Sequence, residues 1–313
     1  MRVKKIQSVV VIATGGTIAG TSSDSADNIG YKAAQLGIDQ LLLGIPDLCA
    51  AGPVISEQLA QINSKDMSFA LWARLAARVN HFMDRDDVRG IVITHGTDTL
   101  EETAYFLHRV CRPGKPVVLT CAMRPATALL SDGPQNMVDA FAVARHAGAT
   151  GVVAVCAGTV HGALDVRKVH AYKLDAFSSG DCGPIAQVEE GRLRLLRNWP
   201  AAPDCQALPA IETIANWPRV EIVMSYAGAS GGIVQALLAQ GVDGLVVAGT
   251  GNGTLHHSLQ AALIEAQQAG VRVVRATRCV NGRVLALLGD VIPDSKGLSP
   301  VKARIALMLE LLA

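Results

Sequence analysis

Residues Val9 to Gly20 read VVVIATGGTIAG, and the rest of the chain is organised around this stretch. Its apolar part is short, continuous and followed by glycine, which predicts a buried parallel strand rather than a helix. Gly15 and Gly16 allow a tight turn with positive φ, in which backbone N–H groups can approach a ligand. Thr17 follows at the carboxyl end of the strand, where open α/β sheets bind ligands. An ordinary glycine-rich β-turn would contain the same residues, and this stretch alone leaves both interpretations open.

Length and composition limit the possible classes of function. A chain of 313 residues is long enough for two domains, or for one large domain with a sizeable core. Half of the residues are apolar and the net charge is +1, which argues against a nucleic-acid-binding protein. No apolar run approaches the ~18 residues of a membrane span. The run behind Met1–Lys5 covers only Val9 to Ala13, less than the ~7–15 residues of a signal-peptide core, so we expect a cytoplasmic protein.

The sequence indicates no disulfide framework, metal or cofactor. Its seven cysteines are scattered and odd in number, and no C-x-x-C occurs, which argues against a thiolate zinc site. Cys121 and Cys156 lie in apolar runs and are predicted to be small core residues. His256 and His257 are adjacent and would point to different helix faces, so we assign no metal. Residues 249–253 (GTGNG) do not extend to the G-x-G-x-x-G spacing of a dinucleotide-binding loop, and no P-loop motif is present.

Two polar segments follow the first strand. Residues 21–31 are polar and lack periodicity, which predicts a loop. Because this loop starts right after Thr17, it could close over a site with Tyr31 as a lid residue, or it could be a plain solvent loop. Apolar residues spaced by three or four between positions 67 and 82 predict an amphipathic helix. Ser64 precedes that helix as a natural N-cap, a place that can also hold a carboxylate.

A second strand-to-helix corner carries more polar residues. Gly90–Thr94 reads as a buried strand, and His-Gly-Thr-Asp-Thr follows at positions 95–99. Thr99-x-x-Glu102 matches a capping box, so a helix is expected to begin at about Thr99. If the two strands are parallel neighbours, Thr97 and Asp98 lie beside Thr17. Asp98 could simply cap the helix, but the string contains more polar groups than capping requires.

The alternation of strands and helices predicts an α/β fold with largely parallel sheets in two domains. Residues 160–197 lose this alternation and contain Lys168, a surface lysine unless burial near a threonine lowers its pKa and makes it a base. Residues 198–217 are irregular and contain several prolines, so we place a linker there. It separates a larger N-terminal domain, residues 1–197, from a smaller C-terminal domain, residues 218–313, where the alternation resumes.

Two long motifs resemble the signatures of the bacterial-type L-asparaginase family. They are residues 13–20 (ATGGTIAG) and residues 94–104 (THGTDTLEETA). The resemblance covers nearly the whole chain, because further matches lie at residues 123–125, 132–134, 251–253 and 302–304. It implies a larger N-terminal and a smaller C-terminal α/β domain, and a homotetramer built as a dimer of dimers. It also implies the hydrolysis of L-asparagine to L-aspartate and ammonia.

The resemblance further implies roles for single residues. Thr17 corresponds to the nucleophile and Tyr31 lies in the lid. Ser64 lies where the family binds the substrate's α-carboxylate, with Gly16 and Lys65 also assigned to substrate binding. Asp98 lies where the family holds the α-ammonium group, and Thr97, Asp98 and Lys168 match the second catalytic group.

Elementary chemistry is compatible with these roles. A threonine hydroxyl is a poor nucleophile until a base takes its proton, which Tyr31 could relay. A neutral Lys168 could activate Thr97 or a water molecule, and N–H groups of the glycine turns could donate to the developing oxyanion. An acyl-enzyme on Thr17 would then be cleaved by water. Which threonine acts in which step stays open at this point.

Three departures from the family pattern concern the substrate. Lys65 stands where the family commonly has Gln, and Gly228 where it often supplies an Asn from a neighbouring subunit. The family's acidic residue late in the C-terminal domain has no clear counterpart in residues 281–294. The affinity for substrate and the preference between asparagine and glutamine are therefore the properties most open to change.

Two other functions stay open. The glutaminase-type subunit of a tRNA-dependent amidotransferase shares the signatures but has an additional N-terminal domain, whereas Thr17 here lies close to Met1. A two-domain amino-acid-binding protein without turnover would explain the glycine corners, yet it would leave Thr17, Thr97 and Lys168 without a role.

Overall fold

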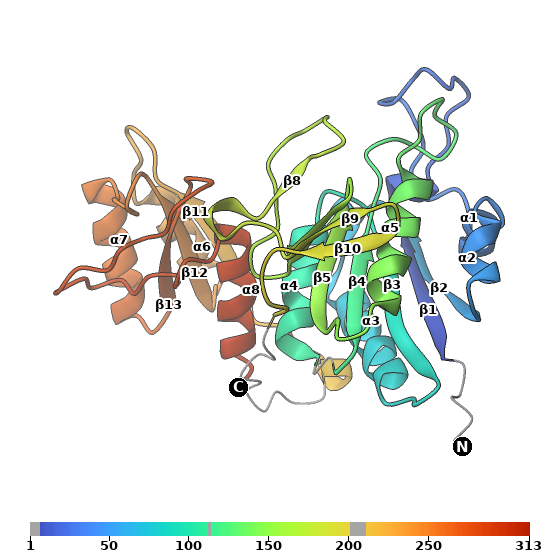
Figure 1. Ribbon diagram of the computed structural model, residues 1–313. Coiled ribbons are helices and arrows are strands. Elements are labelled where there is room, and N and C mark those ends of the chain that lie inside the picture. The colour runs from blue at the N-terminus through green and yellow to red at the C-terminus, as the bar shows by residue number, and fades with distance from the viewer. Residues whose placement is uncertain (1–6, 112–113, 201–210) are drawn as a thin grey trace. The chain divides into compact units, whose positions relative to one another are not determined.

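The computed structural model describes residues 7–111, 114–200 and 211–313 (Figure 1). Contacts divide the chain into two compact units, Met1–Cys205 and Gln206–Ala313, each with its own sheet. Part of the predicted linker, residues 201–210, lies outside the described residues, and the exact domain boundaries stay a prediction.

The N-terminal unit contains an eight-stranded sheet in which five neighbouring strands are parallel. In spatial order these are β2 (Val54–Ile62), β1 (Ser8–Gly15), β3 (Val88–Thr94), β4 (Pro116–Thr120) and β5 (Gly151–Cys156). The chain leaves β1 toward β2 and returns on the other side of β1 as β3. Ligands bind at such a reversal of strand order, outside the carboxyl ends of the strands. The predicted α/β class with a largely parallel sheet is confirmed.

Antiparallel strands extend this sheet where the alternation was predicted to break down. They are β6 (Thr159–Gly162), β9 (Ala186–Glu189) and β10 (Arg192–Leu195). Between β6 and β9 the chain forms a separate two-stranded ribbon, β7 (Arg167–Lys168) with β8 (Phe177–Ser178). The ribbon carries Lys168, so this irregular segment positions a candidate site residue, and Val166 and Phe177 within it are buried.

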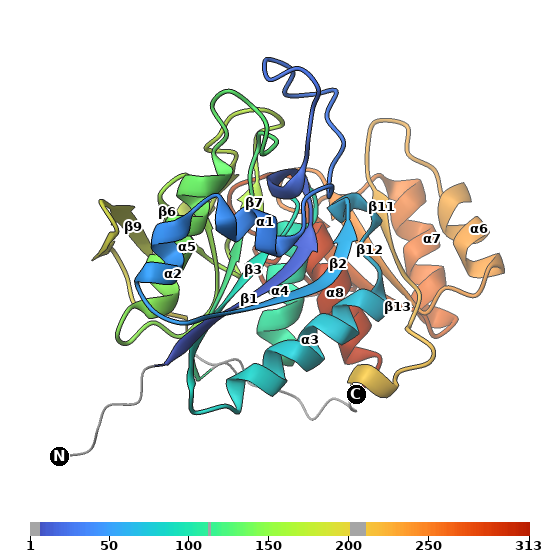
Figure 2. The same cartoon turned by 90° about the vertical axis from the view of Figure 1, so that its right-hand side faces the viewer.

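Helices cover both faces of the large sheet (Figure 2). One face packs against α5 (Gly133–Arg145), α1 (Ile38–Leu43) and α2 (Pro46–Ala50), and the other against α3 (Phe69–Met83) and α4 (Leu100–Val110). Alternate residues of β1 serve opposite faces: Val9 and Val11 belong to the α5 cluster, whereas Val10 is buried outside it. All eight residues of β1 are buried, as expected for a central parallel strand.

Two predicted helix starts differ from the structure. The cap of α3 is Ser68, whose Oγ accepts a hydrogen bond from the N–H of Leu71 (3.3 Å). Ser64 instead opens a short 3₁₀ turn, η2 (Ser64–Asp66), so its predicted N-cap role is wrong. α4 does begin after Thr99, but without the predicted capping box, because Thr99 Oγ1 donates to the carbonyl of Ser64 (2.8 Å). In both cases a tertiary contact replaces the local hydrogen bond.

The C-terminal unit follows the predicted alternation closely. Its sheet has three parallel strands: β11 (Val220–Met224), β12 (Gly244–Gly249) and β13 (Arg272–Thr277). Three helices accompany them, α6 (Gly232–Ala239), α7 (His257–Gln268) and α8 (Pro300–Glu310), and α8 packs along all three strands. Within the described parts of both units, no helix is long and apolar enough to cross a membrane.

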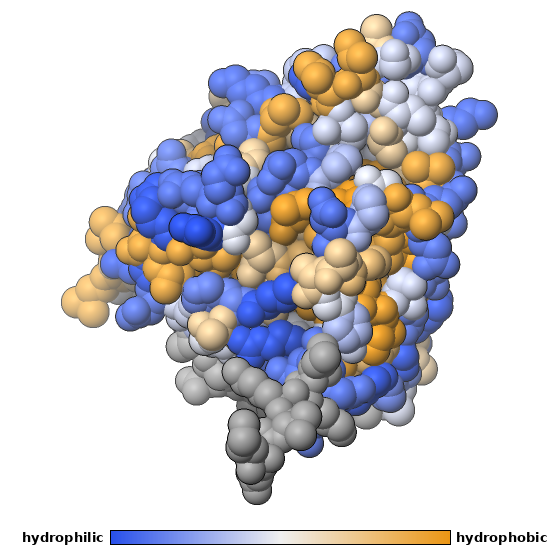
Figure 3. Space-filling model, turned by 45° about the vertical axis from the view of Figure 1, so that its right-hand side comes forward, coloured by the Kyte–Doolittle hydropathy of each residue, from blue (hydrophilic) through white to orange (hydrophobic). Residues whose placement is uncertain are grey.

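Two loops of the N-terminal unit project together (Figure 1). The loop of residues 21–31 is bonded to the segment 125–130 through Ser22 N–H and Thr127 Oγ1 (2.8 Å), and through Leu129 N–H and the Ser25 carbonyl (3.0 Å). Apolar side chains lie near the end of this projection (Figure 3); the exposed ones in these loops are Ile29, Leu129 and Leu130. The loop that follows Thr17 is therefore held in place by hydrogen bonds to a second loop, rather than being a plain solvent loop.

Candidate active site

Thr17 lies at the corner where β1 ends. Its side chain is buried, and its Oγ1 lies 2.6 Å from the Oη of Tyr31, which returns from the projecting loop. Gly16 has φ +86°, and a Cβ there would lie 2.4 Å from the Cα of Gly96, so only glycine allows this approach. The Gly16 N–H donates to the carbonyl of Ile62 (2.9 Å) and is not available to an oxyanion. The N–H of Thr17 has no acceptor among the described residues.

The second corner lies directly beside the first. β1 and β3 are parallel neighbours with Ala13 opposite Thr94. This is the arrangement that the predicted placement of Thr97 and Asp98 beside Thr17 required. Lys168 Nζ donates to Thr97 Oγ1 (2.8 Å) and to Asp98 Oδ1 (2.7 Å). The lysine side chain is only 19% exposed, which excludes a free surface lysine. The structure thus brings Thr97, Asp98 and Lys168 together, although 70 residues separate Asp98 from Lys168.

Ser64 joins this cluster from η2. It is 2% exposed, and its Oγ accepts a hydrogen bond from the N–H of Asp98 (3.2 Å). The hydroxyl proton of Ser64 therefore remains available to donate to an anion. Lys65 is different, because its Nζ pairs with the carboxylate of Asp66 (2.7 Å) and its side chain is 63% exposed. The structure does not bring the Lys65 side chain to the cluster, and its substrate contact stays a prediction.

A buried chain of polar side chains behind the second corner was not predicted. Trp72 Nε1 donates to Thr103 Oγ1 (2.9 Å), and Thr103 Oγ1 lies 2.9 Å from His95 Nε2. His95 Nδ1 lies 2.7 Å from the carbonyl oxygen of Gly96. Burial lowers the pKa of His95 to about 4, so its ring is neutral at physiological pH. The only signal in the sequence is a histidine at a strand end; nothing local predicts Trp72 as part of the chain.

The corner after β4 is held by its own hydrogen bonds. Asp132 accepts from the N–H groups of Met123 and Arg124, both at 2.9 Å, and Asn136 Nδ2 donates to the Cys121 carbonyl (2.9 Å). Cys121 and Cys156 are both buried, as their apolar surroundings predicted, with their Sγ atoms 3.2 Å apart. In the described part of the chain, no group of three His, Cys, Asp or Glu residues could hold a metal ion.

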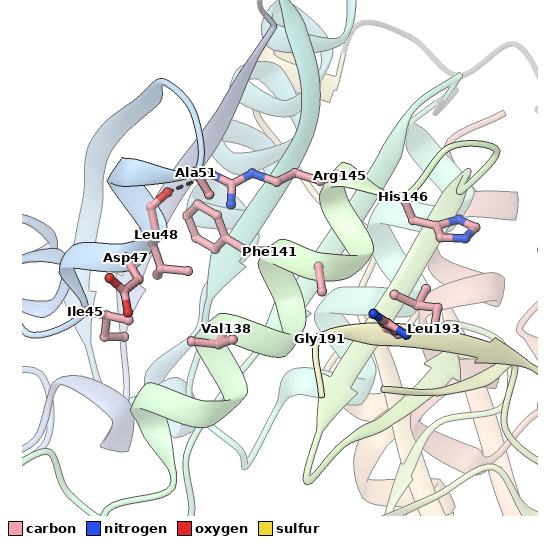
Figure 4. Close-up of a pocket in the computed structure, with 12 residues that line it drawn as sticks. Ile45, Asp47, Leu48, Ala51, Val138, Phe141, Arg145, His146, Gly191 and Leu193 are labelled. Atoms are coloured by element: carbon pink, nitrogen blue, oxygen red, sulfur yellow. Dashed lines mark hydrogen bonds between the residues drawn. The ribbon is translucent and has the colours of Figure 1, made fainter. Parts of the chain in front are cut away.

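A cavity of about 710 Å³ in the N-terminal unit lies among α2, α5 and the turn before Leu193 (Figure 4). Leu48 and Phe141 line it, and Arg145 crosses it to donate to the Leu48 carbonyl (2.7 Å). None of its lining residues carries a hydroxyl or a thiol, and none belongs to the Thr17 or Lys168 clusters. It is therefore not the candidate active site.

One threonine is paired with a tyrosine, and beside it a second threonine is paired with a lysine and an aspartate. This arrangement is typical of an enzyme that acts on a small polar molecule. The comparison with known proteins makes the class specific: the chain belongs to the asparaginase family. Residues 8–201 match the family model "Asparaginase, N-terminal", and residues 219–313 match "Glutaminase/Asparaginase C-terminal domain".

Individual relatives cover nearly the whole chain. A glutaminase-asparaginase of Pseudomonas fluorescens biotype A is 39% identical over 98% of this chain and 87% of its own length. L-asparaginase 2 of Escherichia coli K12 is 37% identical over 98% of this chain and 89% of its own length. A crystal structure of a probable cytoplasmic L-asparaginase from Campylobacter jejuni is similar with a TM-score of 0.93, at 36% identity over 97% of this chain and 95% of that one.

Proposed function

We propose that the chain hydrolyses L-asparagine to L-aspartate and ammonia. The observation that carries the proposal is the pairing of two neighbouring threonine hydroxyls with proton-transfer groups. Thr17 is paired with Tyr31 at 2.6 Å, and Thr97 with Lys168 at 2.8 Å. Membership of a family whose relatives are named asparaginases and glutaminase-asparaginases supports an amide substrate of this kind.

In the proposed reaction Thr17 attacks the side-chain amide carbon. Tyr31 relays the hydroxyl proton: its oxygen accepts the proton of Thr17 while its own phenolic proton passes to the amide nitrogen, which leaves as ammonia when the carbon–nitrogen bond breaks. The N–H of Thr17, which lacks an acceptor within the described residues, would donate to the oxyanion. Water then cleaves the acyl-enzyme, with Thr97 and Lys168 as the second proton-transfer group. Lys168 Nζ, 2.8 Å from Thr97 Oγ1, would pass protons to and from that hydroxyl.

Substrate anchoring is proposed to use groups beside these hydroxyls. Ser64 can donate to the α-carboxylate, because its oxygen already accepts from Asp98 N–H and its proton is unused. The Asp98 side chain is 50% exposed and can hold the α-ammonium with the oxygen that Lys168 does not use. Gly16 contributes because, without a side chain, it lets the corner that carries Thr17 pack against Gly96.

The test is ammonia release by the purified chain on L-asparagine, with L-aspartate identified as the second product. Asparagine binding without ammonia, measured by calorimetry, would favour an amino-acid-binding protein. Ammonia release that depends on an acyl-tRNA acceptor and a partner subunit would favour the amidotransferase subunit. Either result would overturn the proposal.

Two further expectations belong with this function. A homotetramer would be revealed as a particle of about four times the 32.7 kDa chain mass in sedimentation equilibrium. We also expect a cytoplasmic location, like that described for the Campylobacter jejuni protein and unlike the Haemophilus influenzae relative described as periplasmic. Fractionation of cells that produce the chain distinguishes the two compartments.

A further inference from the structure

We infer that His95 is a positioning residue for the proposed hydrolysis: its Nδ1–H holds the Gly96 carbonyl and thereby orients the peptide that carries Thr97. The inference rests on the proposed function, but its evidence is the buried chain of hydrogen bonds behind the second corner. His95 is fully buried and has no hydrogen bond to the hydroxyl of Thr17 or of Thr97, so its effect on the reaction is indirect.

The direction of each proton follows from the chemistry of the donors. An indole Nε1 can only donate, so Thr103 Oγ1 must accept from Trp72 and has its own proton left for His95 Nε2. Nε2 is therefore the acceptor of the neutral ring, and the ring proton lies on Nδ1. From there it donates to Gly96 O at 2.7 Å. Every polar atom of the three side chains is satisfied in only this arrangement.

Gly96 needs an external anchor because no side chain can hold it. A Cβ at this position would lie 2.5 Å from Ser64 Oγ, so the close packing of the two corners excludes any larger residue. Glycine has the greatest backbone freedom, and the next residue is Thr97. A misplacement of ~1 Å in a reacting group can reduce the rate on the order of 10²-fold. The hydrogen bond from His95 restricts the peptide that determines where Thr97 lies.

Two substitutions of His95 by amide side chains distinguish the contribution of Nδ1 from that of Nε2. In His95→Asn the side-chain N–H₂ takes roughly the place of Nδ1, so the bond to Gly96 O is kept and the one to Thr103 is lost. In His95→Gln the amide reaches the place of Nε2, so Thr103 keeps a partner and Gly96 O loses its donor. We expect kcat of the Asn variant within about 10-fold of the native value, and a fall on the order of 10²-fold in the Gln variant, with similar KM in both.

A merely structural role would reduce activity in both variants alike, or more in the smaller Asn, and either pattern would overturn the inference. If neither variant folds, ¹⁵N chemical shifts of the native imidazole still test it. We expect the Nδ1–H tautomer with no change of protonation from pH 8 to pH 5.5, and an Nε2–H tautomer would contradict the assignment. A native chain that releases no ammonia would overturn the proposed function while leaving this tautomer measurement valid.

Discussion

At the scale of single residues, the site depends on hydroxyl groups whose partners come from distant parts of the chain. Thr17 pairs with a tyrosine 14 residues away, whereas Thr97 pairs with a lysine 71 residues away. Both threonines are 6% exposed, so each side chain is largely buried but keeps a small solvent-accessible surface. This combination gives each hydroxyl a fixed direction and leaves it within reach of a small substrate.

Thr17→Ala is expected to abolish turnover, because it removes the proposed nucleophile. We expect kcat to fall on the order of 10⁴-fold or more, and the unfolding free energy to change by only about 1 kcal/mol, the value of one hydrogen bond. Ammonia release and thermal unfolding are the measurements, with Thr17→Ser as the control that keeps a hydroxyl. An alanine variant with most of its kcat would remove Thr17 from the role of nucleophile.

Lys168→Met keeps the apolar stem of the side chain and removes the amine. Since a positioned base typically contributes on the order of 10²–10⁴-fold, kcat should fall by that factor while KM changes little. Steady-state kinetics over a range of pH are the measurement, and Lys173→Met, on an exposed lysine, is the control. Near-native kcat at every pH would return Lys168 to an ordinary structural lysine.

His95 makes a prediction about stability at acid pH. Burial lowers the pKa of His95 from 6.5 to about 4, so the unfolded chain binds this proton first as the pH falls. The stability from the neutral ring is therefore present above about pH 6.5 and is lost as the pH falls toward 4, by up to ~3 kcal/mol. Denaturant unfolding at pH 7 and pH 4.5 should show a smaller loss for His95→Asn than for the native chain. Equal losses would contradict a buried neutral His95.

At the scale of secondary-structure elements, the sequence predicted the alternation of strands and helices but misjudged two caps. The continuous apolar runs correctly predicted β1 and β3, because a strand buried on both faces needs no polar residue. Caps are harder to predict, since Ser64 and Thr99 satisfy local rules yet bond to each other's segments across 35 residues. Pro46 occupies the first position of the short helix α2, where its missing N–H costs no hydrogen bond.

Ser64 and Ser68 provide a matched pair at the start of α3. Ser68→Ala removes the true cap and should lower the unfolding free energy by ~1 kcal/mol, with kcat/KM unchanged. Ser64→Ala should raise the KM for asparagine at least about 10-fold, because a hydrogen bond to a carboxylate contributes roughly 1.5–3 kcal/mol. Chemical denaturation and steady-state kinetics on both variants check this. The reverse pattern would show that Ser64 serves the helix and not the substrate.

At the scale of the whole molecule, substrate preference is the property least determined by the described site. Asparagine and glutamine offer the same α-amino and α-carboxyl groups, so Ser64 and Asp98 would anchor both. They differ by one methylene, which moves the amide carbon away from Thr17 on its rigid strand end. We expect kcat/KM to favour asparagine on the order of 10²-fold. Comparable kcat/KM values for the two amides would contradict this expectation.

Gly228 tests the cause of that preference. It stands where the family often has an Asn, its φ is +76°, and no atom lies within 4 Å of a Cβ placed there. Asparagine tolerates this backbone conformation better than most residues, so Gly228→Asn should fold. It is expected to raise kcat/KM for glutamine more than for asparagine, and Gly228→Ala is the control for the backbone change. No gain in the Asn variant would show that Gly228 serves as space rather than as a missing contact.

The sequence by itself determined the α/β class, the position of Thr17 after a buried strand, and the second corner at Thr97 and Asp98. Hydrophobic periodicity and glycine turns are local properties, so they can be identified from the sequence alone. Only the tertiary structure decided that Tyr31 reaches Thr17, that Lys168 reaches Thr97, and that His95 holds Gly96. These pairings depend on β1 lying next to β3 and on the loop and ribbon folding back over their carboxyl ends. The order of the strands and the path of the loops depend on contacts between residues that are 14 to 71 positions apart in the sequence. A pattern of neighbouring residues cannot predict such contacts.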